Sequence, residues 1–322
     1  MRVLFAALLL LGTSYGAERD QAPVTLVATS SRPLDVAGFS SWGAAQCDLG
    51  GNLYFHTGLY LSDLIFLKLG SDDTHQLYTA SGSPDGGKEY FVAFRVSPDG
   101  KLLVLAGGKN DSISLLAYSD DPTMPRRTKL DTPELFDPPT VSNFVVLQNE
   151  HVRVYGVLGE KAPKREQGHR YSMEFGPSGE LVRRTMDKAA GGSSAADRYQ
   201  DASAAQSNDG TLYVLAEDKV LVLSPAGQLI RKIKLRLPEP GFEAHELYVA
   251  GQRLVVGFDK KNPGGHTLTV RFVLIDGSNG EQLRLYQPGP ETGNSMVCFS
   301  NDGFTFFKVE NRHVKLVTAA AN

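Results

Sequence analysis

The sequence predicts an all-β protein, a six-bladed β-propeller of four-stranded blades that is closed by an N-terminal strand. Three observations lead to this fold class. A motif in which a tight glycine turn precedes a strand rich in Leu, Tyr, Val and Phe recurs six times along the 322 residues. The turns are about 50 residues apart, the length of one four-stranded blade. Helical periodicity is nearly absent, and residues 194–205 are the only candidate for a short helix.

The first 16 residues have the layout of a secretory signal peptide, which leaves residues 17–322 as one propeller domain. Arg2 supplies a positive charge, Val3–Leu11 is an unbroken apolar run, and Ser14 and Gly16 are the small residues expected before a cleavage point. A transmembrane helix needs about 20 apolar residues, so this run is too short to be one. We therefore expect a secreted or periplasmic protein with no transmembrane segment in the mature chain.

The repeated motif places the turns of the six units along the chain. It is clearest in four ranges, 47–55, 96–104, 207–214 and 300–307, and weaker copies cover 147–154 and 249–256. The turn positions are 51, 100, 150, 210, 251 and 303. Glycine suits these hairpins because it adopts positive φ without steric strain. A second hairpin follows in the later half of each unit, most clearly Val220–Leu223 with Gln228–Leu235.

The sixth unit lacks a fourth strand, since the chain ends soon after the third strand at His313–Thr318. The apolar segment Val24–Ala28 follows the signal peptide and precedes the first unit. We expect it to pair beside Val314–Val317 as the outer strand of the last blade. Such pairing would close the ring and remove exposed sheet edges.

Two cysteines occupy equivalent places in the first and last units. Cys47 and Cys298 both fall in predicted inner strands, which become neighbours when the ring closes. They precede their turn glycines by four and five residues, so they have opposite strand parity and point either toward each other or directly apart. Both a disulfide and two buried free thiols are compatible with this placement.

The turn-and-strand motifs resemble those of a known group. Residues 97–104 and 220–229 look like repeats of the six-bladed NHL and YVTN propellers, and the resemblance covers most of the mature chain. It implies that ligands bind on the face formed by the loops that lead into the innermost strands. The resemblance carries over no complete set of metal ligands, and a fold alone does not assign a function.

The overall composition excludes two classes of protein. The chain has 33 basic and 36 acidic residues, a net charge of −3, whereas a nucleic-acid partner favours a strongly basic face. Two cysteines are too few for a disulfide framework or a cysteine-ligated zinc site. We therefore expect no nucleic-acid partner.

The loops that lead into the innermost strands are the expected ligand face. They hold twelve acidic and four basic residues, which predicts an acidic channel mouth that repels anions. Aromatic residues recur at the start of these strands, either as packing residues or as stacking surfaces for a sugar, peptide or cation. Burial of Phe136 and Phe242 in a plugged channel is the other interpretation. The candidate ligand-binding residues are Trp42, Tyr90, Glu134, Phe136, Tyr199, Asp201, Phe242, Glu243 and His245.

The densest titratable cluster is formed by Glu243, His245 and Glu246, near the innermost strand of the fifth unit. A carboxylate beside a histidine can serve acid–base chemistry or ligate a metal. An ordinary histidine at a strand end is the other interpretation, and no residue is assigned a catalytic role.

From these features we expect the protein to be a binding or interaction module for a small ligand, a sugar or a protein partner. The alternative is a metal-dependent hydrolase or lactonase with its site at the channel mouth. The cofactor is unknown, and a divalent metal is expected only under this alternative. A third class is a docking disc within a larger exported assembly. Convergence of three or four oxygen or nitrogen ligands at about 2.0–2.6 Å from one point would favour the enzyme.

Overall fold

The regular secondary structure is all β-strand within the part that this computed structural model describes. The described residues are 22–34, 45–57, 64–70, 72, 74–80, 89–97, 100–108, 112–119, 121–133, 141–187, 204–216, 218–261, 268–300, 303–310 and 313–321. The expected signal peptide at 1–16 lies outside these residues. So does most of the candidate helix at 194–205, whose last two residues begin a strand instead.

Four of the sheets have four strands each, in chain order from the innermost strand outward. The first is β2 (Ala45–Cys47), β3 (Leu53–His56), β4 (Ile65–Leu69) and β5 (His75–Thr79). The second is β6 (Tyr90–Val96), β7 (Leu102–Gly107), β8 (Ile113–Ala117) and β9 (Arg126–Leu130). The third is β10 (Val141–Val146), β11 (Val152–Val157), β12 (Arg170–Phe175) and β13 (Leu181–Asp187). The fourth is β14 (Ala204–Gln206), β15 (Leu212–Ala216), β16 (Lys219–Leu223) and β17 (Leu229–Lys234).

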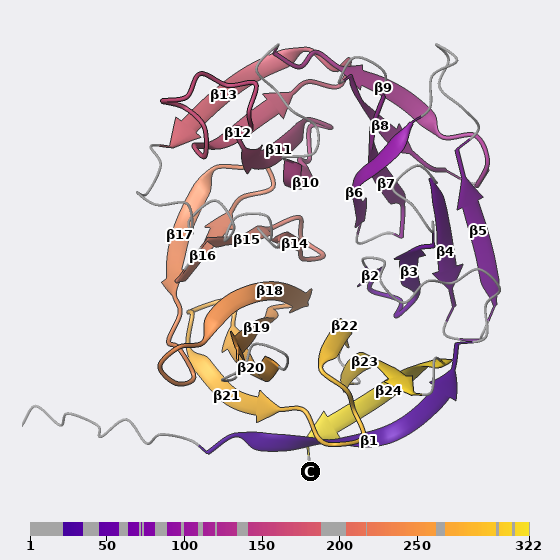
Figure 1. Ribbon diagram of the computed structural model, residues 1–322, viewed down its shortest axis with the longest axis vertical. Helices are drawn as coiled ribbons and strands as arrows, with labels where there is room; N and C mark the ends of the chain where they lie inside the picture. The colour runs from indigo at the N-terminus through magenta and orange to yellow at the C-terminus, as the bar shows by residue number, and fades with distance from the viewer. Residues whose placement is uncertain are drawn as a thin grey trace, which may run out of the picture.

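The remaining strands form one eight-stranded sheet in the order β18-β19-β20-β21-β1-β24-β23-β22. Its bounds are β18 (Glu243–Ala250), β19 (Arg253–Lys261), β20 (Leu268–Asp276), β21 (Gln282–Gln287), β22 (Ser295–Ser300), β23 (Gly303–Glu310), β24 (His313–Ala321) and β1 (Val24–Pro33). A parallel contact of two residue pairs, Val24 with Tyr286 and Thr25 with Gln287, joins its two halves. Figure 1 shows the sheets arranged like propeller blades around a common centre, with the outer strands following one another along the rim.

All six predicted turn positions adopt positive φ. Five are glycines, and the sixth is Glu150 with φ of 60°. Among the described residues, Glu150 is the only non-glycine residue in this region of the backbone. The turns therefore follow the predicted repeat, even where the repeat lacks a glycine.

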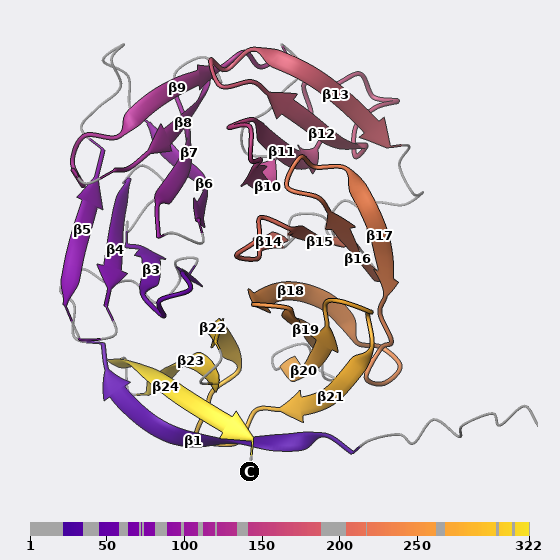
Figure 2. The ribbon, with the colours of Figure 1, turned by 180° about the vertical axis from the view of Figure 1, so that it is seen from behind.

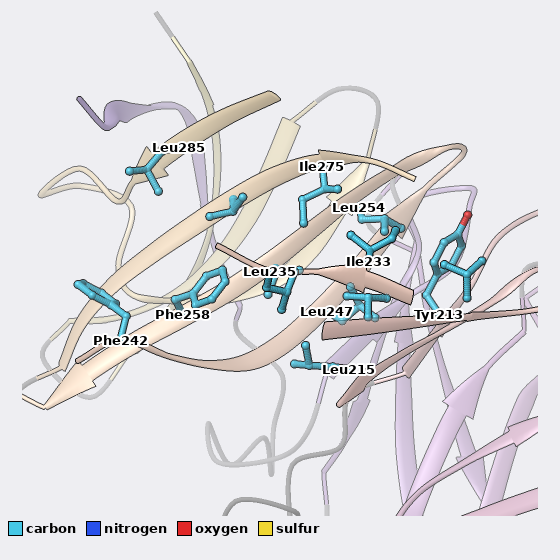
Figure 3. Packing of buried hydrophobic residues seen from close by; sticks show 14 residues of the cluster. Tyr213, Leu215, Ile233, Leu235, Phe242, Leu247, Leu254, Phe258, Ile275 and Leu285 are labelled. Atoms are coloured by element: carbon cyan, nitrogen blue, oxygen red, sulfur yellow. The ribbon is translucent and has the colours of Figure 1, made fainter. Parts of the chain in front are cut away.

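The core lies between neighbouring sheets. Figure 3 shows one hydrophobic cluster that joins strands β15–β17 to strands β18–β21, with Leu235 and Ile233 on one side and Ile275 and Leu254 on the other. The second strands of the sheets carry consecutive buried residues, as in β3, β7, β15 and β19. Both faces of these strands are therefore packed against neighbouring parts of the fold. Packing of this kind fixes the positions of the innermost strands.

Strand β1 pairs with β24, but the register differs from the prediction. The expected pairing set Val24–Ala28 beside Val314–Val317, whereas Ala28 lies opposite Ala319 and Ser31 opposite Val317. Both strands are longer than expected, because β24 continues through the C-terminal alanines and β1 continues to Pro33. Figure 2 shows the two strands side by side along the rim.

Neighbouring innermost strands are joined by side chains. Cys47 of β2 and Cys298 of β22 form a disulfide, with their Cα atoms 5.6 Å apart. Gln46 of β2 accepts a hydrogen bond from the Val96 backbone N–H and donates one to the Phe94 carbonyl, both on β6. These side chains bridge strands that belong to separate sheets, and they hold the wall around the centre.

Candidate functional site

The described part of the chain contains four of the nine predicted ligand-binding residues. They are Tyr90, Phe242, Glu243 and His245. The other five, Trp42, Glu134, Phe136, Tyr199 and Asp201, lie outside the described residues. These four residues lie on β6 and on or next to β18.

Tyr90 begins β6 and pairs with Gly107 of β7. A Cβ atom added at Gly107 would come within 2.2 Å of the Tyr90 ring, so the ring lies directly over the glycine backbone. The tyrosine is half-buried. One face of the ring is thus occupied by the protein, which restricts its use as a stacking surface.

Phe242 packs into the core. Its exposed fraction is 2%, and it belongs to the cluster between β15–β17 and β18–β21. The Lys260 ammonium and the Arg271 guanidinium each lie 5.8 Å from the centre of its ring. The geometry thus follows the packing interpretation at this position and leaves no open ring face for a ligand.

A β-bulge in strand β18 positions His245. Ala244 pairs with Phe258 and Glu246 with Gly257, so His245 is the extra residue between them. The innermost strands β6, β10 and β22 are bulged near the same end, which makes the bulge a recurring property of the architecture. A bulge redirects the side chain that it carries, and in β18 this side chain is titratable.

Glu246 lies beside His245. The His245 Nε2 atom is 3.6 Å from the Glu246 Oε1 atom, and the two side chains are 27% and 37% exposed. The opposite residue, Gly257, makes this arrangement possible, because a Cβ atom there would lie 3.2 Å from the Glu246 Cβ and 3.4 Å from the His245 Cε1. Glycine at position 257 therefore leaves room for both side chains over β19.

Tyr248 extends the cluster toward β22. Its hydroxyl lies 2.9 Å from Glu246 Oε2 and 2.5 Å from the Met296 carbonyl oxygen, so the single phenol proton can be donated to either acceptor. Burial, and secondarily the nearby Glu246 carboxylate, raise the pKa of Tyr248 well above its ordinary value. The tyrosine stays protonated and orients Glu246. Sequence reasoning missed it, although it lies two residues from Glu246 and so shares its side of the strand.

Only one of the two nitrogens of the His245 ring lies near a polar partner among the described residues. Its Nδ1 atom is buried and has no hydrogen-bond partner among the described residues. Most buried polar side-chain atoms in proteins have a hydrogen-bond partner, from the protein or from water. The pair of His245 and Glu246 is thus a candidate for a site on an innermost strand.

Three carboxylates of the predicted acidic rim are paired with cations in the described residues. Glu291 contacts the Lys308 ammonium at 2.8 Å, Glu239 lies 4.0 Å from the Arg271 guanidinium, and Glu89 pairs with Arg127. The predicted acidic bias considers only the loop residues, whereas these cationic partners lie on the strands. The expected repulsion of anions by unpaired carboxylates therefore does not hold at these three positions.

A buried cation lies in the innermost wall. The Arg95 guanidinium of β6 donates to the Asn143 Oδ1 atom at 2.9–3.1 Å and to the Phe144 carbonyl at 2.9 Å, both on β10. Burial lowers the pKa of Arg95 to about 10, still well above neutral pH. Sequence reasoning did not single out this residue, because its partners come from the following unit.

The described residues do not form a complete metal site. Across the described ranges, no three His, Cys, Asp or Glu side chains converge as metal ligands. His245 and Glu246 supply two candidate ligands, and Asp201 and Glu134 of the predicted set lie outside these ranges. None of the described segments forms a helix that could span a lipid bilayer.

Comparison with known proteins supports the fold. The structure is similar to the calcium-binding protein regucalcin from Agrobacterium tumefaciens, with a TM-score of 0.50, 11% identity, and coverage of 92% of this chain and 95% of that chain. It is also similar to a protein of unknown function from Bacteroides caccae, with a TM-score of 0.49, 15% identity, and coverage of 77% and 83%. No family model and no curated protein matches the chain. The fold is a β-propeller. At these identities, the propeller likeness extends to the fold and not to activity.

Proposed function

We propose that the protein is an exported six-bladed β-propeller of the NHL-like type that acts as a binding module for a small ligand, a sugar or a protein partner. The four four-stranded sheets are four blades. The two halves of the eight-stranded sheet, β18–β21 and β22–β24 with β1, are the fifth and sixth blades. Their link is only two residue pairs long, as expected for two blades that touch at the rim.

Two links support closure of the ring. Strand β1 supplies the outer strand of the sixth blade, and the Cys47–Cys298 disulfide joins the innermost strands of the first and sixth blades. Disulfides persist in oxidising compartments, so this bond also supports the proposed secreted or periplasmic location. The signal peptide at residues 1–16 is part of the same proposal.

The single observation that carries the binding site is the pair of His245 and Glu246 on the bulge of β18. The pair offers a donor and acceptors 3.6 Å apart on an innermost strand, and both side chains are partly exposed. Hydroxyl groups of a sugar or a cationic group could hydrogen-bond to both residues. Trp42, Tyr199 and Asp201 belong to the proposed mouth as expected from the sequence.

The alternative is a metal-dependent hydrolase or lactonase. It is favoured by the same pair, because imidazole and carboxylate groups suit several divalent metals. A third ligand would have to come from the loops that hold Glu134 or Asp201. The calcium binding described for regucalcin is a property of that protein, and this alternative rests on His245 and Glu246 alone.

A thermal-shift screen of the mature protein tests both functions. The ligands are neutral sugars, lactones, calcium and zinc, and the proteins are the wild type, a His245→Ala, Glu246→Gln double variant and a His75→Ala control. His75 is an exposed histidine on the outer strand β5. Stabilisation that is lost only in the double variant supports the site. A ligand that stabilises all three proteins equally would rule it out, and stabilisation by metal alone would favour the enzyme.

A further inference from the structure

The C-terminal end of β17 adjoins a pocket on the rim of the molecule, away from the innermost strands. The pocket has a volume of about 290 Å³ and lies between the end of β17 and the turn that joins β20 to β21. Leu235 and Ile275 belong to its lining, and Figure 3 shows both among the buried apolar side chains of this region. Lys234 at the end of β17 and Arg236 just after it line one side, and Glu281 and Gln282 line it from the next sheet.

Strand β17 is the outer strand of its sheet, so one of its edges has no strand partner among the described residues. The Leu235 N–H donates to the Asp218 carbonyl at 2.7 Å, on the side of β16. Because hydrogen bonding alternates along a strand, the backbone groups of Lys234 and Lys232 point toward the other edge. This edge therefore offers main-chain donors and acceptors to an additional strand.

The molecule itself shows how such an edge can be used. Strands β17 and β21 both have six residues, and in each the second residue, Ile230 or Leu283, is an extra residue in the register with the inner neighbour. Aligned in this way, Ile233 and Lys234 of β17 are equivalent to Tyr286 and Gln287 of β21. In β21, these two residues pair in parallel with Val24 and Thr25 of β1. The equivalent edge of β17 has the pocket instead.

The side chains at this edge indicate the chemistry of an occupant. Ile230, Lys232, Lys234 and Arg236 alternate along the segment and are all exposed, whereas Ile233 and Leu235 between them are buried. The exposed row carries three positive charges at a two-residue period. Side chains of an added strand repeat at the same period, so acidic residues at alternate positions would each meet a cation. One carboxylate, Glu281, lines the same pocket as Lys234 and Arg236.

We propose that the edge of β17 at Lys232–Lys234 binds an extended acidic peptide segment of another protein. The segment pairs with β17 in parallel, as β1 pairs with β21, and places an apolar side chain in the pocket beside Leu235 and Ile275. Main-chain hydrogen bonds supply affinity, and the row of cations supplies selectivity for acidic sequences. This surface is separate from the proposed ligand site on β18.

The experiment measures binding of a fluorescein-labelled peptide of alternating Glu and Val to the mature protein by fluorescence anisotropy. A second peptide has the same sequence with N-methyl groups on alternate residues, which removes its main-chain donors. Lys234→Glu is the test variant. Lys129→Glu is the matched control, because Lys129 is an exposed lysine on the outer strand β9. We expect Lys234→Glu and N-methylation each to weaken binding about tenfold or more, and Lys129→Glu to leave it within about twofold.

Three outcomes would overturn the proposal. An equal loss of peptide binding in Lys129→Glu would show that the acidic peptide is attracted non-specifically to basic residues on the rim. Equal binding of the N-methylated peptide would exclude strand pairing, and this arm uses only the wild-type protein, so it does not depend on the folding of a variant. Preferential binding of phosphatidylglycerol vesicles, lost in Lys234→Glu, would assign the row of cations to a lipid surface instead.

Discussion

Cys47 and Cys298 are joined by a disulfide, although 251 residues separate them in the sequence. Both lie on innermost strands, one on β2 and the other on β22. The bond therefore links the beginning of the described sheets to the end, and it encloses most of the fold in one covalent loop.

Removal of this bond is expected to destabilise the protein strongly. In the chain-entropy model, a cross-link that closes a loop of this length destabilises the unfolded chain by about 5–6 kcal/mol, and loss of a native disulfide typically costs about 2–5 kcal/mol. We expect a Cys47→Ser, Cys298→Ser variant to lose stability of this order in urea unfolding monitored by fluorescence. Two reactive thiols in the unfolded, unreduced wild type would contradict the bond itself.

The N-terminal strand is the second test of ring closure. Leu26 of β1 is fully buried against residues of the eight-stranded sheet. Deletion of residues 17–30 should lower the melting temperature substantially, and Leu26→Ala alone should cost about 2–5 kcal/mol. Val27, which is 41% exposed, provides the control substitution Val27→Ala. An unchanged melting curve after the deletion would refute the contribution of β1.

Glu150 offers a test of the repeat at its weakest copy. Its φ of 60° is strained for a residue with a Cβ atom, at a cost of roughly 1–2 kcal/mol. Glycine removes this strain but raises the entropy of the unfolded chain, so we expect Glu150→Gly to stabilise the protein by about 0.5–1 kcal/mol. Glu150→Ala is the control, since it keeps the strain and removes only the exposed contact with Arg126. A loss of stability in the glycine variant would contradict the expected strain.

Glu310 makes stability depend on pH in the acidic range. Hydrogen bonds from Lys308 and Lys315 lower the pKa of Glu310 from 4.5 to about 2. A lowered carboxylate pKa contributes stability above the unfolded value, and the contribution is lost as the pH falls toward the folded value. Between about pH 4.5 and pH 2, the wild type should therefore lose more stability than Glu310→Gln. Parallel acid-unfolding curves for the two proteins would show that Glu310 does not form its ion pairs with Lys308 and Lys315.

The sequence predicts local features of this protein better than contacts between distant segments. The turns at 51, 100, 150, 210, 251 and 303 are set by short motifs, and the backbone has positive φ at each of them. The register predicted for β1 is wrong, because the register depends on how far β24 extends at the other end of the chain. The sequence does not predict the ion pairs of Glu291 and Glu239 for the same reason. Their partners, Lys308 and Arg271, lie on strands that are distant from them in the sequence.

The contribution of Gly257 to the candidate site can be measured directly. An alanine methyl group there would lie 3.2 Å from the Glu246 Cβ, which must give by a few tenths of an ångström, and would touch the His245 Cε1 at 3.4 Å. We expect Gly257→Ala to cost about 1–3 kcal/mol of stability and to move the His245 ring resonances in NMR spectra. The close contact with the ring is absent once His245 is an alanine. In a double-mutant cycle with His245→Ala, the two substitutions should therefore couple by about 0.5 kcal/mol or more, whereas independent sites add within about 0.3–0.5 kcal/mol. Strict additivity, with unchanged His245 resonances, would show that the glycine does not position the histidine.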